Sequence, residues 1–207
     1  MPDDYKEVTR ATYDVVADSY AKRDKGSVDE SDDVHAALNE FASLLQPNAR
    51  VLDTGCAAGR DSYFLDRFGF RVTGIDFSPE MVERAKRTVP GATFKVMDFE
   101  ELPFTNEFDA VWANASLHHI PKRNLPVVLA AINRALKPGG YFFIKVKHGA
   151  ADSIRENEKF GGKIKRYFAF YQNDELHRLL EEAGFSILSI KNTTQDEWVE
   201  ATAEKPA

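Results

Sequence analysis

The sequence predicts an α/β protein built around a doubly wound sheet, and three observations carry that prediction. In residues 50–62, RVLDTGCAAGRDS, a short β-prone run is followed by a turn of small residues and then by a typical helix start. Strand-like and helix-like patterns alternate along the chain that follows. Three successive predicted strands end in an acid, Asp53, Asp76 and Asp98. These acids should share the carboxyl edge of the sheet, where α/β proteins bind ligands.

The N-terminal part of the chain is expected to be helical. Apolar and aromatic residues at three- and four-residue spacings predict one helix, or two short ones, over residues 5–22. A second, amphipathic helix is predicted over residues 34–45, and Pro47 ends it. The polar and acidic residues 24–33 are expected to form the loop between the two.

The first strand and helix unit surrounds the small-residue turn. We expect a strand over residues 50–53 and a helix over residues 60–68. Gly55 and Gly59 can adopt positive φ or let a ligand come close, because neither has a Cβ atom. The first N–H groups of the helix and its dipole should face the turn, which predicts a site for an anionic group.

The later elements follow from the same patterns. Ser78 before Pro79 predicts a capped helix start, and Gly139 with Gly140 predicts a sharp turn before a buried strand. The expected strands cover residues 70–76, 93–97, 108–113, 141–147, 185–190 and 198–204, and the expected helices cover residues 79–88, 127–136 and 174–183.

Composition excludes several classes of protein. The 207 residues suit a single domain spanning residues 1–207, and no apolar run approaches the ~20 residues of a membrane span. The formal net charge of -6 argues against general nucleic-acid binding. Cys56 is the only cysteine, which excludes an internal disulfide and a multi-cysteine zinc site. We therefore expect a cytoplasmic protein with no metal site.

Two segments resemble one family. Asp53, Gly55, Ala57 and Gly59 match an Asp-x-Gly-x-Gly-x-Gly pattern, with alanine in place of the middle glycine. This resembles the first motif of class I S-adenosylmethionine-dependent methyltransferases. Residues 134–146, RALKPGGYFFIKV, are similar to the family's segment before and through its fifth strand. The resemblance covers residues 50–185 and is to small bacterial-type domains, types 11 and 25.

The resemblance implies a more detailed fold. It implies a Rossmann-like doubly wound sheet of seven strands in the order 3-2-1-4-5-7-6, with the last strand antiparallel. It also implies that the N-terminal helices, within residues 1–46, form a lid over the cofactor. Residues 147–173 come after the fifth strand, so they are expected to form an insertion that faces the substrate, although a plain connector is the alternative.

The cofactor implied is S-adenosylmethionine, with S-adenosylhomocysteine as the product. Asp76 can accept hydrogen bonds from both ribose hydroxyls, and the alternative is a turn or cap acid. Phe77 would contact the adenine ring. In the family's pattern Asp98 binds the adenine amino group, and the N–H of Phe99 meets a ring nitrogen. Further cofactor contacts are expected at Asp53, Gly55, Cys56, Ala57, Gly59, Met81, Ala113 and Asn114, with Cys56 acting as a small packing residue rather than as a nucleophile.

The reaction edge is expected just after the fourth strand. Asn114 can orient the cofactor or the acceptor. His118 or His119, near the unperturbed histidine pKa of ~6.5, can take a proton from the acceptor. Packing at the start of a helix is the alternative for this pair.

The substrate side combines the lid and the insertion. Residues 147–173 are basic and aromatic, and Arg166 or Lys165 can hold an anionic acceptor. The substrate-binding residues expected are Tyr13 and Tyr20 from the lid and Arg166 and Tyr171 from the insertion. For both lid tyrosines, half-buried packing is the alternative.

The predicted function is methyl transfer from S-adenosylmethionine to an O, N or C nucleophile of a small molecule, by a monomer or a homodimer. Three alternatives stay open: a tRNA or other nucleic-acid methyltransferase, a non-catalytic S-adenosylmethionine-binding module, and a nicotinamide oxidoreductase. The oxidoreductase shares Gly55, Gly59 and Asp76, but it does not explain Asp98 followed by Phe99.

Overall fold

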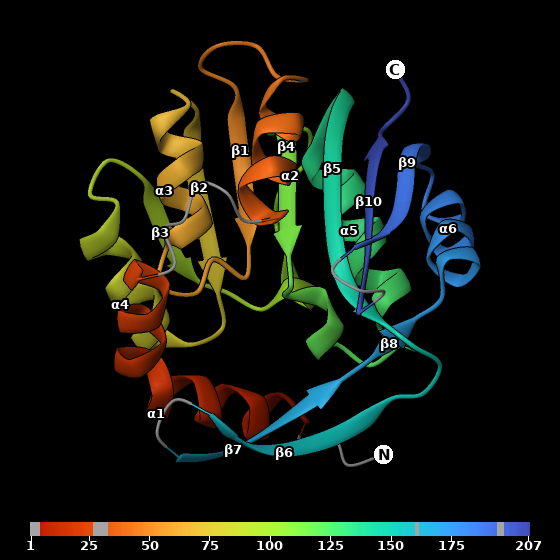
Figure 1. The fold of residues 1–207 in the computed structure, drawn as a ribbon. Helices are drawn as coiled ribbons and strands as arrows, with labels where there is room; N and C mark the ends of the chain where they lie inside the picture. Colours follow the sequence, from red (N-terminus) through yellow and green to blue (C-terminus); the bar gives the residue numbers. More distant parts are fainter. Residues whose placement is uncertain (1–4, 27–32, 160–161, 194–196) are drawn as a thin grey trace.

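The structure is a computed structural model that describes residues 5–26, 33–159, 162–193 and 197–207. An eight-stranded sheet forms its centre, with helices on both faces. Helix α1 (Tyr5–Gly26) and a two-stranded hairpin lie together across one end of the sheet, at the bottom of Figure 1. That end is the carboxyl edge of the parallel strands.

The strand order confirms the prediction. The sheet runs β3-β2-β1-β4-β5-β10-β9, and β10 is antiparallel to both of its neighbours. The strands are β1 (Arg50–Thr54), β2 (Arg71–Asp76), β3 (Thr93–Val96), β4 (Phe108–Asn114), β5 (Leu136–His148), β9 (Ser186–Thr193) and β10 (Trp198–Glu204). The strand β8 (Phe170–Tyr171), which the sequence patterns did not predict, pairs with the end of β5 and is the eighth strand.

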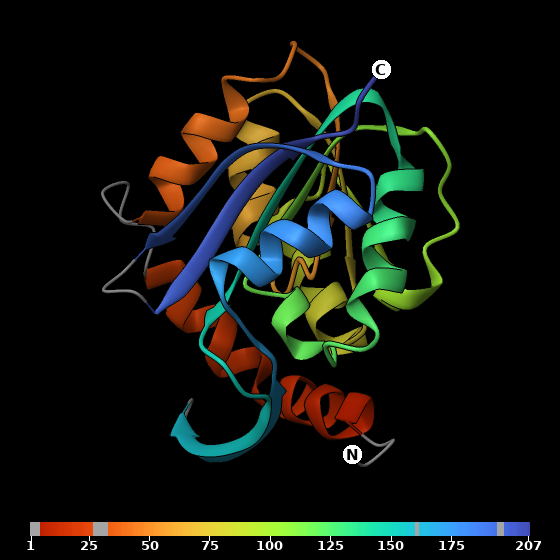
Figure 2. The same ribbon diagram turned by 90° about the vertical axis from the view of Figure 1, so that its right-hand side faces the viewer.

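Successive side chains of each strand point to opposite faces of the sheet, so the core is divided between the two faces. Val51 packs with Phe41 and Leu65, from helices α2 (Asp33–Ala42) and α3 (Arg60–Arg67), on one face. Leu52 belongs to the core on the other face, which is covered by α5 (Leu125–Ala135) and α6 (Asn173–Glu182). Figure 2 shows the two layers. Helix α4 (Pro79–Thr88) and the short helices η1 (Phe99–Glu101) and η2 (Leu117–His119) complete the described elements.

Of the two N-terminal helices expected to form a lid, one lies over the carboxyl edge. Helix α1 is continuous over 22 residues and crosses the carboxyl edge. Helix α2 packs on the face of the sheet instead, and only Val34 from this helix lines the cavity described below. Among the described residues, no helix is both long and apolar enough to span a membrane.

The insertion forms a hairpin. Strands β6 (Ser153–Lys159) and β7 (Gly162–Phe168) are antiparallel, and Glu156 stands opposite Lys165. The many charged residues in this segment hid its strand character from the sequence analysis. The hairpin packs on the lid, because Thr12 Oγ1 donates to the Lys165 carbonyl at 2.7 Å and Tyr167 N donates to Thr9 Oγ1 at 3.4 Å.

The predicted turn at Gly139 and Gly140 is an irregularity within β5. Gly139 has a φ of 75° and donates its N–H to the Lys205 carbonyl at 2.8 Å. The register with β4 shifts between the pair Phe108 and Leu136 and the pairs that follow. The turn chemistry is therefore present, but the β-sheet pairing continues through it.

Candidate active site

A cavity of about 570 Å³ lies at the carboxyl edge, between the strand ends, α1 and the hairpin. Its volume falls within the range of small-molecule sites. The expected site residues that line it are Tyr13, Tyr20, Gly55, Ala57, Asp76, Phe77, Asp98, Phe99, Asn114, His118, His119 and Arg166. Asp53 and Cys56 line a small recess, and the residues it shares with the cavity are Tyr20, Gly55, Ala57, Arg60 and Asn114.

Four expected site residues do not line the cavity or the recess. Met81 is fully buried in a cluster with Ala17 and Ala58. Ala113 and Tyr171 are fully buried in the main core. Gly59 precedes α3 with a φ of 88°, and a Cβ there would lie 3.1 Å from Ala85 Cα, so its small size serves the packing of α3 on α4.

The turn after β1 requires glycine at one position and tolerates alanine at another. Gly55 has a φ of 80°, and a Cβ at this position would lie 2.3 Å from Ser116 Cβ. Ala57, which replaces the family's middle glycine, has a φ of 45°. This left-handed conformation costs a non-glycine residue roughly 1–2 kcal/mol. The departure from the motif is therefore accommodated by local strain and not by a different turn.

Substitutions at these two residues should affect stability differently. We expect Gly55→Ala to lower the melting temperature by about 5–15 °C, because it adds both a clash and a strained φ. Ala57→Gly should leave the melting temperature within about 3 °C of the wild type. Relief of the backbone strain should offset the larger conformational entropy that glycine loses on folding. Thermal unfolding followed by circular dichroism measures both. Equal destabilisation by the two changes would contradict the packing described for Gly55.

Three N–H groups of the turn after β1 donate to acceptors within the protein. The N–H groups of Gly55 and Cys56 both donate to the Ile75 carbonyl, at 2.8 and 3.0 Å. Ala57 N donates to Asp76 Oδ2 at 3.0 Å. The predicted anion site concerned the first N–H groups of the helix after the turn, so these contacts of the turn residues leave it a prediction. A diphosphate would find these donors already used, whereas a nucleoside without phosphates does not need them.

Asp76 is a buried acid at the centre of the cavity wall. Its Oδ1 accepts from Ser78 N at 2.9 Å, while its Oδ2 accepts from Ala57 N. Burial raises its pKa to about 6, although the hydrogen bonds from backbone N–H groups act in the opposite direction. Ser78 Oγ itself accepts from Met81 N at 3.2 Å and caps α4, so Asp76 is not needed as the cap, as expected.

The lid contacts the third acid. Asp98 Oδ2 accepts from Lys6 Nζ at 2.7 Å, and Asp98 Oδ1 accepts from Glu100 N at 3.0 Å. The phenyl rings of Phe77 and Phe99 lie near one another, with centroids 6.5 Å apart. All four expected residues of the nucleoside side, the two acids and the two phenylalanines, thus meet in one cavity.

The recess is organised by Asp61, an acid that the sequence analysis missed. Its Oδ2 accepts from Trp112 Nε1 at 2.9 Å and from Asn114 Nδ2 at 2.8 Å. Its Oδ1 accepts from Arg60 Nε at 2.8 Å. An acid in the first turn of the helix after a glycine-rich loop was the signal in the sequence. The amide of Asn114 is therefore held by Asp61 at the cavity wall.

The two buried acids of the recess have pKa values shifted in opposite directions. Asp53 accepts from Ser62 Oγ at 2.6 Å, and burial and the nearby Asp61 raise the pKa of Asp53. For Asp61 burial acts in the same direction, but Arg60 and the donors from Trp112 and Asn114 outweigh it and lower its pKa. Asp61 is therefore the charged member of the pair near neutral pH.

The histidine pair differs from the expectation of a pKa near 6.5. His119 is buried, and burial lowers its pKa to about 3. Its Nδ1 lies 2.7 Å from the Tyr167 carbonyl, so Nδ1 carries the proton and Nε2 accepts from the Tyr13 hydroxyl at 2.8 Å. His118 stacks on Phe168, and burial lowers its pKa well below the ordinary value. Both imidazoles are neutral at physiological pH.

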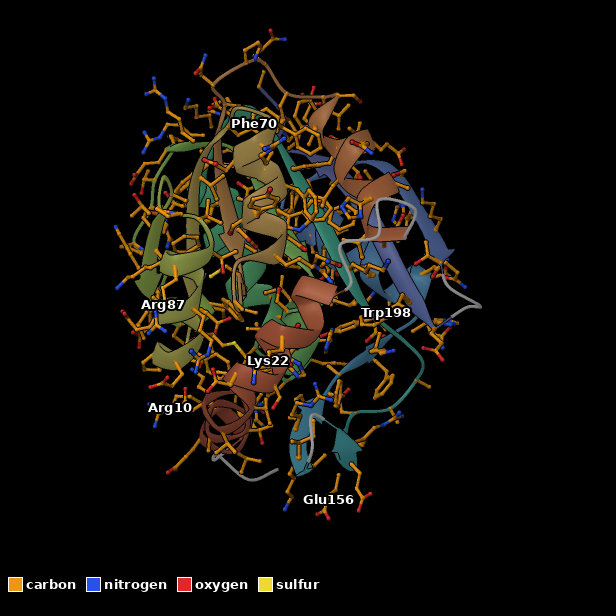
Figure 3. The ribbon with its side chains drawn as sticks, turned by 60° about the vertical axis from the view of Figure 1, so that its left-hand side comes forward. Arg10, Lys22, Phe70, Arg87, Glu156 and Trp198 are labelled. Atoms are coloured by element: carbon orange, nitrogen blue, oxygen red, sulfur yellow. The ribbon has the colours of Figure 1, made fainter. Side chains whose placement is uncertain are left out.

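The far end of the cavity is cationic and aromatic. The residues there that the sequence analysis did not assign to the site are Lys145, Lys147, Arg155, Phe168, Phe170 and Trp198. Lys147 Nζ lies 3.8 Å from the centroid of the Trp198 ring. In Figure 3 Trp198 lies at the edge of the sheet above the hairpin, and Glu156 lies at the outer side of the hairpin. Lys145 and Lys147 alternate on β5, and this spacing could have predicted that both face the cavity. Trp198 comes from the last strand, and no such pattern marks it.

Comparison with known proteins identifies the family. A model of the methyltransferase domain family, type 23, matches residues 29–190, which is most of the chain. The chain is a class I S-adenosylmethionine-dependent methyltransferase. The methyltransferase is 31% identical over 153 residues to an uncharacterised methyltransferase of Synechocystis sp., an alignment that covers 70% of each protein. This membership confirms the resemblance at the level of the class and excludes the nicotinamide oxidoreductase.

Two further relatives carry more specific names. The methyltransferase is 34% identical over 175 residues to the 27-O-demethylrifamycin SV methyltransferase of Amycolatopsis mediterranei, covering 76% of this chain and 62% of the relative. The Burkholderia thailandensis 1,6-didemethyltoxoflavin-N1-methyltransferase, solved with 1,6-didemethyltoxoflavin and S-adenosylhomocysteine, superposes with a TM-score of 0.69. It is 26% identical, and the match covers 100% of this chain and 91% of that one.

S-adenosylmethionine is the methyl donor of this methyltransferase, and the residues present fit it. Gly55 and Ala57 line the cavity with small residues at the turn, and Asp76 presents a buried carboxylate to it. The occupied N–H groups of the turn favour a nucleoside without a diphosphate.

Proposed function

We propose that this methyltransferase acts on a small molecule, at an O, N or C nucleophile. The observation that carries the proposal is the cavity, which continues from the strand-end acids Asp76 and Asp98 into a chamber covered by α1 and the hairpin. A covered chamber of this size suits a small ligand, whereas a nucleic-acid strand needs a long groove. The names of the rifamycin and toxoflavin relatives support the same class of acceptor.

The cofactor is proposed to lie along the carboxyl edge. In this arrangement Asp76 accepts hydrogen bonds from the ribose hydroxyls, and Asp98 accepts one from the adenine amino group. Phe77 and Phe99 border the adenine. The recess with Asp61 and its neighbours Asp53, Asn114 and Arg60 would hold the amino-acid end, because it offers both carboxylates and a guanidinium.

The protein's part in the reaction is alignment and exclusion of water. When bound, S-adenosylmethionine supplies a methyl group on a sulfonium, which needs no further activation. The lid residues Tyr13 and Tyr20 and the strand-end residue Asn114 border the cavity from opposite sides, so they can orient an acceptor between them. Cover by α1 and β7 keeps water from the reacting atoms.

His119 is proposed to position Tyr13. Its Nε2 accepts a hydrogen bond from the Tyr13 hydroxyl, and this hydroxyl also accepts one from Arg166 Nη1 at 3.2 Å. A proton could pass from the acceptor through Tyr13 to His119, but the lowered pKa of His119 makes this step unfavourable near neutral pH. Burial lowers the pKa of His118 as well. The geometry therefore favours an acceptor that needs little help in losing a proton.

The class of acceptor can be tested directly. The protein is incubated with S-adenosylmethionine labelled in the methyl group and, separately, with a size-filtered metabolite extract, total RNA or a protein extract. We expect label only in the metabolite extract. Label in RNA would establish the nucleic-acid alternative, and cofactor binding without label in any fraction would establish the non-catalytic module.

A further inference from the structure

Arg166 is a buried cation with no counter-ion in the part of the chain that the structure describes. It lies on β7 and faces the cavity, and only 8% of its surface is exposed. Its Nη1 donates to the Tyr13 hydroxyl at 3.2 Å, and its Nε has no hydrogen-bond partner. Within the described ranges 5–26, 33–159, 162–193 and 197–207, no carboxylate forms an ion pair with it.

An unpaired buried guanidinium is costly. Removing such an ion from water costs several kcal/mol, and the cost is recovered only by a well-placed anion and hydrogen bonds. The rings of Phe168 and Tyr13 lie 5.0 and 5.8 Å from the guanidinium carbon and give partial compensation. A neutral phenol and a phenyl ring do not replace a carboxylate. The site therefore favours an anion from outside the protein.

The surroundings of Arg166 reinforce this charge. Lys145, Lys147 and Arg155 line the same end of the cavity. Lys145 pairs with Glu200 at 3.6 Å and Lys147 with Glu197 at 3.3 Å, so the two lysines are partly neutralised. The acids that line the cavity, Asp76, Asp98 and Glu100, belong to its opposite, nucleoside end.

We propose that Arg166 binds an anionic group of the methyl acceptor, so that the substrate class is a small molecule bearing a carboxylate. This inference rests on the proposed function, methylation of a small molecule. The guanidinium fork of Arg166 matches the two oxygens of a carboxylate. Cations at this end of the cavity also lower the pKa of an acceptor hydroxyl, which compensates for the lack of a basic histidine.

A carboxylate can also come from the cofactor itself, on its amino-acid end. The recess already offers Arg60 to that group, and it lies beside the turn after β1. Arg166 instead contacts Tyr13 and Phe168, on the lid and the hairpin. Binding of S-adenosylhomocysteine to Arg166→Gln distinguishes these two sources.

The test uses a metabolite extract split on a strong anion exchanger. Methyl transfer from labelled S-adenosylmethionine is measured with the retained and the unretained fractions, for the wild type and for Arg166→Gln. We expect transfer with the retained fraction, reduced about a hundredfold in kcat/KM by Arg166→Gln and partly restored by Arg166→Lys. The affinity for S-adenosylhomocysteine, measured by calorimetry, should stay within about threefold.

The matched control is Lys165→Gln, which removes the same charge from an exposed neighbour on the same strand. It should leave transfer unchanged. Transfer with the unretained fraction alone would overturn this inference and leave the proposed function intact. Transfer with neither fraction would overturn the proposed function. Loss of S-adenosylhomocysteine affinity in Arg166→Gln would assign the anion to the cofactor and overturn the inference. A lower melting temperature of Arg166→Gln with unchanged kcat/KM would show a purely structural role.

Discussion

Replacement of Asp76 with alanine should weaken binding of S-adenosylhomocysteine by about a hundredfold or more, because the two charge-assisted hydrogen bonds that we propose it accepts from the ribose would be lost. The carboxylate lies in the cavity wall at the end of β2. Calorimetric titration with S-adenosylmethionine, S-adenosylhomocysteine and NAD measures the effect. The wild type should bind both sulfur nucleosides and should not bind NAD.

The control for this prediction is Asp76→Asn. Ala57 N and Ser78 N both donate to the carboxylate, so alanine also removes two acceptors from the fold. Asparagine keeps the shape and one oxygen, and a thermal unfolding curve shows whether the protein is folded. A folded Asp76→Asn protein that binds S-adenosylhomocysteine as tightly as the wild type would remove Asp76 from the ribose site.

The pH dependence of binding reports on the same group. Burial raises the pKa of Asp76 to about 6, so the free protein takes up a proton as the pH falls through that value. A protonated carboxyl is the poorer acceptor, and the affinity should therefore be fully present above pH 7 and fall on acidification. Between pH 7.5 and pH 5 we expect a loss of about tenfold, which Asp76→Asn should abolish.

Asp61→Ala is expected to have a large effect on stability. The substitution leaves the buried Trp112 indole N–H and the half-buried Asn114 amide without this acceptor, and it removes the contact with Arg60 Nε. Breaking such a buried network costs roughly 3–5 kcal/mol, and relief of the repulsion with Asp53 offsets part of it. We expect a net loss of about 3 kcal/mol, or about 6–12 °C in melting temperature.

Two variants make this prediction specific. Asp61→Asn keeps one acceptor oxygen and should cost less than alanine. Asp66→Ala removes a partly exposed acid from the same helix and should change the melting temperature by about 2 °C at most. If Asp61→Ala had the same melting temperature as the Asp66→Ala control, the role of Asp61 as the centre of the recess would be contradicted.

The tertiary structure decided which chemistry the histidines can support. Their adjacency and their place after β4 were readable from the sequence, and η2 holds both at the cavity. Their pKa values depend on burial beneath Phe168 and Tyr167, which come from the insertion far along the chain. No local pattern reports that burial, so the expectation of an ordinary imidazole was wrong.

The same distinction explains the substrate end. Arg166 was visible in the sequence as a basic residue of the insertion, with Lys165 as an equal choice. Pairing of β6 with β7 decides between them, because alternate residues of a strand face opposite sides. Arg166 is buried and lines the cavity, whereas Lys165 is exposed. Trp198 joins them only because β10 inserts between β5 and β9.

The sequence by itself determined the secondary-structure elements and the edge of the sheet at which the site lies. Periodicity and turn residues predicted the alternating strands and helices and the shared edge with Asp53, Asp76 and Asp98, because strand ends and turns depend on nearby residues, while the family resemblance implied the strand order. What only the tertiary structure decided is the acceptor chamber. It is built where α1, the β6–β7 hairpin and β10 meet, and contacts between such distant segments depend on packing, which leaves no local signal in the sequence.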